Sequence, residues 1–173
     1  MALVQISRGA EVKHNYVDGV SRVPILEGAY HDATVERISI QPGADLTPEI
    51  FSRQEHNQVF LITAGKGYIV TPRRVFNITE VSVFVPDFDK EQFTFHCAAD
   101  AKENMEIVHF VTELSDYDKT CLKESHLTLP RFRGVSQAWH YKEDFTGADI
   151  QQMMLIEHRN LGRLSMGANF GTG

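Results

Sequence analysis

Residues 54–67 read Gln-Glu-His-Asn-Gln-Val-Phe-Leu-Ile-Thr-Ala-Gly-Lys-Gly. A polar start leads into the bulky run Val59–Ile62, and a Gly-Lys-Gly sequence closes the segment. β-Branched and aromatic residues bounded by glycine predict a strand that ends in a tight turn. Alternate side chains of a strand share one face. The segment therefore places four side chains on one face, which are His56, Gln58, Phe60 and Ile62.

Further β-rich runs lie on both sides of this segment, separated by turn sequences such as Gln41-Pro42-Gly43 and Pro86-Asp87. The runs that we predict as strands are Val23–Leu26, Thr34–Ile40, Val59–Ile62, Gly67–Val70, Val75–Ile78, Val81–Val85, Gln92–Phe95 and Met105–Thr112. Many short strands at regular spacing are typical of an antiparallel barrel or sandwich. The predicted fold class is all-β.

Residues 54–67 resemble the first motif of the cupin superfamily, which has a polar His-containing loop, a strand of bulky residues and a Gly-x-Gly turn. The second cupin motif, a strand ending in Pro followed five residues later by His, has its counterpart in Val83–Phe93. The resemblance covers roughly residues 20–113. It implies an antiparallel cupin-type β-barrel (jelly roll), followed by a linker and extra C-terminal strands.

The resemblance also locates the positions that bind metal in cupins, which usually hold two His and a Glu in the first motif and a His in the second. In this chain the four positions are occupied by Ser52, Gln54, Gln58 and Glu91. Divalent transition metals favour imidazole, carboxylate or thiolate ligands. We therefore expect a degenerate site without a metal cofactor. The alternative is a divalent metal held by His56 and Glu91 with water.

Polar side chains at a barrel mouth can still bind a small molecule, because such pockets combine apolar walls with a few polar groups. The candidate ligand-binding residues are Gln54, His56, Gln58, Glu91, Phe60 and Phe93. Two alternatives remain open: the polar residues form an ordinary hydrogen-bonded cluster, and the phenylalanines fill the barrel, as side chains do in small closed sheets. We favour core filling for the phenylalanines. No catalytic residue is assigned, and His109 is expected to be a hydrogen-bonded core histidine.

Composition narrows the classes of partner. The chain has 173 residues, 42% hydrophobic and 23% charged, with a formal net charge of −6. An acidic balance disfavours nucleic acid and anionic membrane surfaces as partners, because both reward clustered Lys and Arg. Apolar runs far shorter than about 20 residues predict no membrane span, and the N-terminus lacks a secretory signal pattern. A cytoplasmic location is expected.

Three regions follow from the change in character along the chain: a cupin-like barrel over 1–113, a polar linker or short helix over 114–125, and a segment over 126–173. Arg37–Ile40 followed by Pro-Gly resembles Arg163–Met166 followed by a Gly-rich tail. An internal repeat would make 126–173 the start of a second, incomplete cupin-like domain of a two-cupin protein. Otherwise it is a dimerisation segment. Unpaired sheet edges tend to be covered, so we expect this segment to pack on the first barrel or on a second subunit in a homodimer.

These observations support two functions. The first is a cupin-like protein with a degenerate metal site that binds a small polar molecule or serves as a structural half. The second is part of a metal-dependent two-cupin enzyme, of the dioxygenase, hydrolase or isomerase type, whose active site lies in the second barrel.

Overall fold

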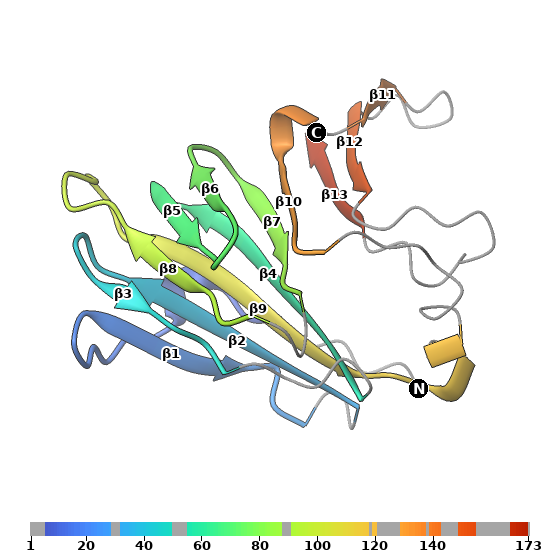
Figure 1. The fold of residues 1–173 in the computed structure, drawn as a ribbon, viewed down its shortest axis with the longest axis horizontal. Helices are drawn as coiled ribbons and strands as arrows, with labels where there is room; N and C mark the ends of the chain where they lie inside the picture. The colour runs from blue at the N-terminus through green and yellow to red at the C-terminus, as the bar shows by residue number, and fades with distance from the viewer. Residues whose placement is uncertain are drawn as a thin grey trace.

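The computed structural model describes residues 6–28, 32–49, 55–87, 91–117, 119–120, 129–137, 139–142, 149–154 and 167–172. Apart from short helical turns, its regular elements are strands, which confirms the predicted all-β class (Figure 1). The elements are η1 (Gly9–Glu11), β1 (Val20–Ile25), β2 (Ala33–Ile40), β3 (Asp45–Leu46), β4 (His56–Ala64), β5 (Gly67–Val70), β6 (Val75–Ile78), β7 (Ser82–Val85), β8 (Thr94–Cys97), β9 (Met105–Glu113), β10 (Arg131–Gly134), η2 (Val135–Gln137), β11 (Trp139–Lys142), β12 (Asp149–Met154) and β13 (Gly167–Thr172).

Two antiparallel sheets build the barrel. Among the described residues, one sheet has the order β1-β2-β9-β4-β7-β10 and the other has the order β3-β8-β5-β6. A third sheet, β11-β12-β13, is formed by the C-terminal strands. The order mixes strands that are distant in the sequence, as in a jelly roll, and Figure 1 shows β9 between β2 and β4. No helix in the described part of the chain is long and apolar enough to span a membrane.

The core lies between the two barrel sheets, on the faces that alternation predicted. Phe60 and Ile62 of β4 are fully buried, as are Ile38 of β2 and Phe95 of β8. Four phenylalanine rings pack on one another at centroid distances of 5.0–6.3 Å, and they are Phe60, Phe84, Phe93 and Phe95. Edge and tilted contacts of this kind add to the free energy gained from apolar burial. The expectation that the phenylalanines fill the barrel is confirmed.

The Gly-x-Gly turn after β4 requires both glycines. Gly65 has φ +89°, a left-handed conformation that side chains with a Cβ rarely adopt. A Cβ on Gly67 would lie 1.9 Å from the backbone oxygen of His96. The turn that marks the motif in the sequence is thus required by backbone conformation at one position and by close approach of β8 at the other.

Several strands differ from the prediction, either in their bounds or because no strand was predicted there. The run predicted as Gln92–Phe95 is shifted to β8, Thr94–Cys97. The two-residue β3 was not predicted, and neither was β10. A two-residue strand is defined by its partner β8, and such pairing leaves little trace in local sequence.

β10 comes from the segment after residue 126, yet it pairs with β7 and forms an edge of the six-stranded sheet. Phe132 stands opposite Phe84 in this pair and packs against the core. Part of the C-terminal segment thus packs on the first barrel, which was one of the two expected arrangements. The division into 1–113, 114–125 and 126–173 stays a prediction, as does the homodimer.

Candidate functional site in the barrel

β4 and β8 run in the same direction along the barrel, one in each sheet. Gly67, just beyond β4, stands opposite Cys97 at the end of β8. The backbone N–H of Ala98 donates to the carbonyl of Lys66 at 2.9 Å. Both strands therefore end at the same end of the barrel, and both begin towards the opposite end.

Gln58 and Glu91 both lie towards that opposite end. Gln58 is two residues before Phe60, and Glu91 is two residues before Phe93. The rings of Phe60 and Phe93 are in edge contact, with centroids 5.4 Å apart. The two predicted polar residues are thus on the same side of the phenylalanine cluster.

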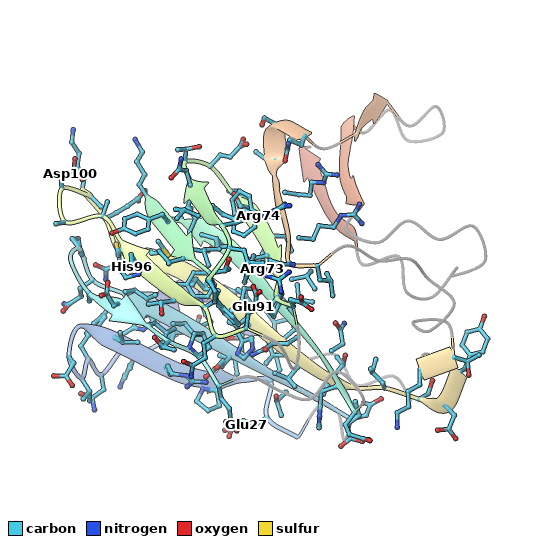
Figure 2. The ribbon with its side chains drawn as sticks, in the orientation of Figure 1. Glu27, Arg73, Arg74, Glu91, His96 and Asp100 are labelled. Atoms are coloured by element: carbon cyan, nitrogen blue, oxygen red, sulfur yellow. The ribbon has the colours of Figure 1, made fainter. Side chains whose placement is uncertain are left out.

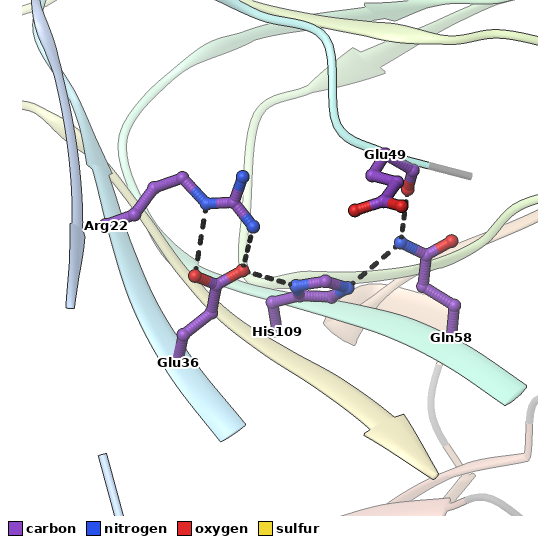
Figure 3. A network of polar contacts seen from close by, with 5 residues as sticks. All are labelled: Arg22, Glu36, Glu49, Gln58 and His109. Carbon is purple, nitrogen blue, oxygen red and sulfur yellow. Dashed lines mark hydrogen bonds and ion pairs between the residues drawn. The ribbon is translucent and has the colours of Figure 1, made fainter. Parts of the chain in front are cut away.

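A row of polar side chains crosses the inward face of the large sheet at this level (Figure 3). Glu36 of β2 stands directly opposite His109 of β9, and His109 stands opposite Phe60 of β4. Nδ1 of His109 hydrogen-bonds Oε1 of Glu36 at 2.7 Å, and the Arg22 guanidinium donates to both oxygens of the same carboxylate at 2.6 and 3.1 Å. On the other side, Nε2 of His109 lies 3.1 Å from Nε2 of Gln58.

Glu36 is held as a carboxylate. Burial alone would raise its pKa, but the hydrogen bonds from His109 and Arg22, together with the charge of Arg22, lower the pKa to about 2. Conversely, the hydrogen bond to Glu36 raises the pKa of Arg22. A charged acceptor therefore faces Nδ1 of His109 over the ordinary pH range.

The contacts of Gln58 determine how its amide is oriented. Its Nε2 donates one hydrogen to the carbonyl oxygen of Glu49 at 2.9 Å, and the other is directed at Nε2 of His109. Because an amide nitrogen only donates, Nε2 of His109 acts as the acceptor in this contact, and Nδ1 donates to Glu36. Both amide hydrogens of Gln58 are used, and its Oε1 is buried without a partner among the described residues.

His109 is fixed by its ring as well as by its nitrogens. The imidazole lies flat on the ring of Phe60, with centroids 4.2 Å apart and planes 4° from parallel. The side chain is 4% exposed. The expectation of a hydrogen-bonded core histidine is confirmed.

Glu91 lies at the rim of the same end. Its Oε1 pairs with Nε of Arg73 at 2.5 Å. Arg73 lies in the turn between β5 and β6, and Figure 2 labels it beside Glu91. Arg73 is largely exposed, whereas the side chain of Glu91 is only 8% exposed. Oε2 of Glu91 is buried and has no hydrogen-bond partner within the described ranges. The site thus holds a second acceptor without a donor.

Comparison with known proteins finds similar solved structures. No protein-family model and no curated protein sequence matches this chain. YlbA from E. coli matches with a TM-score of 0.59 at 10% identity, over 86% of this chain and 56% of its own. KdgF from a Halomonas species matches with a TM-score of 0.52 at 14% identity, over 66% of this chain and 98% of its own. A predicted oxalate decarboxylase from Thermotoga maritima matches with a TM-score of 0.51 at 15% identity, over 64% of this chain and 100% of its own.

The chain has the cupin fold. Likeness at 10–15% identity carries the architecture and not the activity. The cupin motifs quoted from the sequence are located in the structure on β4, on the turn that follows it and around the end of β7.

The described residues do not fit a divalent metal at the cupin position. Gln58 is neutral, and its amide hydrogens are already bonded. Glu91 already has a cationic partner in Arg73. Within the described ranges, no group of three or more His, Cys, Asp or Glu residues could hold a metal ion. Ser52 and Gln54, at the other two cupin ligand positions, lie outside the described residues.

The structure brings together some of the predicted ligand-binding residues. Phe60 and Phe93 are in contact, and Gln58 is joined to Phe60 through His109. Glu91 precedes β8 and pairs with Arg73 at the same end of the barrel. His56 is half-buried at the start of β4, where it stands opposite Glu113 of β9. Gln54 lies outside the described residues.

Two residues of the polar row, Glu36 and Arg22, were not among the candidates. Glu36 shares the inward parity of Ile38 and Ile40 in the predicted strand 34–40. A charged residue at an inward position was therefore an available signal. Its partner could not be found in this way, because His109 is 73 residues away in the sequence.

Proposed function

We propose that this cupin-fold protein binds a small polar molecule, without a metal, at the barrel end that contains Gln58 and Glu91. The observation that carries this proposal is Oε1 of Gln58, which is buried and has no partner among the described residues. A buried acceptor without a donor costs about 1–3 kcal/mol. Such an atom is satisfied by ordered water or by a ligand.

The surroundings of this atom suit a binding site better than a merely structural core. Glu91 contributes a second acceptor without a partner on the same side of the phenylalanine cluster. Next to Gln58, His109 stacks on the ring of Phe60, and that ring contacts the ring of Phe93. Small-molecule sites typically combine apolar walls with a few fixed polar atoms.

The test is a ligand-observed NMR screen of a broad metabolite library against the full chain, followed by calorimetric titration of each hit. Gln58→Met removes the acceptor at nearly constant volume and is expected to weaken or abolish binding. Gln41→Met, at an exposed position, is the matched control and should bind normally. A library without hits, or hits that Gln58→Met binds unchanged, would contradict the proposal.

A second candidate is part of a metal-dependent two-cupin enzyme. It is favoured by the extent of the match to YlbA, which covers 86% of this chain but 56% of the YlbA chain. Elemental analysis of protein purified without chelators tests it. Stoichiometric metal that is retained in both His56→Ala and Glu91→Ala would support this alternative, because its metal site lies in the second barrel, whereas protein free of metal would contradict it.

A further inference from the structure

The hydrogen-bonding state of Gln58 restricts what can bind beside it. An amide side chain normally offers two donors and one acceptor. Here both donors are engaged, by the Glu49 carbonyl and by Nε2 of His109. Only Oε1 is left for a ligand, so Gln58 presents an acceptor and nothing else.

The Glu36–His109 pair prevents the amide from turning over. A rotated amide would place Oε1 against the Glu49 carbonyl and against the lone pair of His109 Nε2, so two hydrogen bonds would become two repulsive contacts. Nε2 of His109 keeps that lone pair because the proton is on Nδ1, where it is directed at the Glu36 carboxylate. Arg22 holds that carboxylate from its other side.

Among the described residues, three buried side-chain atoms have no partner: Nε of Arg37 is a donor, whereas the other two, Oε1 of Gln58 and Oε2 of Glu91, are acceptors. Arg22 pairs with Glu36 and Arg73 pairs with Glu91, and the carboxylate of Glu49 adds a further negative charge that acts on Arg22. An anion would face two acceptors, and a cation would compete with Arg73 for a carboxylate that is already paired.

We propose that the ligand is a neutral compound with several hydroxyl groups, of the polyol or monosaccharide class, which donates hydrogen bonds to Oε1 of Gln58 and Oε2 of Glu91. In this proposal His109 and Glu36 are positioning residues that make the site selective for donors. The inference rests on the proposed small-molecule function and specifies its ligand class.

The experiment titrates the full chain at pH 7 with a panel of pentitols, hexitols and free hexoses. Three comparison probes accompany the panel: O-permethylated sorbitol, which lacks donors, succinate, which is an anion, and ethanolamine, which is a cation. Millimolar concentrations keep the general stabilising effect of polyols small. At least one polyol or hexose should bind, and the three comparison probes should not.

Two variants test the assigned atoms. Gln58→Met and Glu91→Gln should each weaken polyol binding by ~3–10-fold, the effect of losing one hydrogen bond. Gln41→Met and Glu103→Gln, both at exposed positions, should leave it unchanged. Unchanged affinity in both site variants would overturn the proposal.

A third variant tests positioning. His109→Phe keeps an aromatic ring on Phe60 but removes the acceptor that orients the Gln58 amide. We expect the ratio of the affinity for a polyol to the affinity for its permethylated counterpart to fall. A merely structural role of His109 would leave this ratio unchanged. A ligand that is anionic, cationic or donor-free would overturn this inference and leave the proposed function intact. The absence of any ligand in the broad library would contradict both.

Discussion

Glu36 accepts a hydrogen bond from Nδ1 of His109 at 2.7 Å, across directly paired positions of β2 and β9. The pair directs Nδ1 of His109 at Glu36 as the donor and leaves Nε2 as an acceptor for the Gln58 amide. It thereby links the charge of Glu36 to the orientation of an amide on a third strand. Several measurable consequences follow from this arrangement.

Replacing the carboxylate should destabilise the fold. Glu36→Gln loses charge-assisted hydrogen bonds from His109 and Arg22, and we expect the free energy of unfolding to fall by about 1–3 kcal/mol. The contribution of Arg22 is the smaller part, because its side chain is 45% exposed. Urea denaturation measures the change. Glu103→Gln, at an exposed position, should alter stability by less than about 0.5 kcal/mol, and equal effects of the two variants would count against the network.

The same carboxylate predicts a pH dependence. Its pKa is about 2 in the folded protein and 4.5 ordinarily. Because the folded pKa is the lower one, Glu36 contributes stability that is fully present above about pH 4.5 and is lost as the pH falls towards 2. Urea unfolding of wild type and Glu36→Gln between pH 7 and pH 2.5 should show their difference narrowing below pH 4.5. A difference that stays constant across this range would refute the assignment.

The phenylalanine cluster should dominate core stability. Phe60 is fully buried and contacts three other phenylalanines and His109. Phe60→Ala is expected to cost about 3–5 kcal/mol. Val75→Ala, at a residue that is 60% exposed, should change stability by less than about 0.5 kcal/mol. Chemical denaturation of the two variants decides whether the ring is a core residue or part of an open wall.

Gly67 should tolerate no side chain. Gly67→Ala places a Cβ against the backbone oxygen of His96, and a strand must move to make room. We expect a loss of more than about 2 kcal/mol. Gly9→Ala is the matched control, because the group it meets is the flexible guanidinium of Arg37. Similar melting temperatures for the two variants would show that the turn after β4 is looser than described.

A homodimer is the remaining expectation about assembly. β1 and β10 are the edges of the six-stranded sheet among the described residues, and exposed edges favour pairing. Sedimentation of the full chain should give twice the monomer mass. A monomer at all concentrations, with residues 126–173 rapidly cleaved by protease, would contradict this prediction.

Sequence alone was enough for the parts of the molecule that depend on local pattern. The alternation in 56–62 predicted which side chains face the barrel, and Gln58, Phe60 and Ile62 are all fully buried. The Gly-Lys-Gly sequence predicted the turn at 65–67. These features follow from strand geometry and from the backbone freedom of glycine, and both act over a few residues.

What only the tertiary structure decided is which polar groups meet. Glu36 and His109 are 73 residues apart, and Gln58 and His109 are 51 apart. Their contacts depend on β9 inserting between β2 and β4, an order that the sequence does not state. A shift of one residue in either register would turn one partner to the outer face. The sequence therefore determined the barrel and its inward faces, whereas strand order and register determined that Gln58 is left as an acceptor.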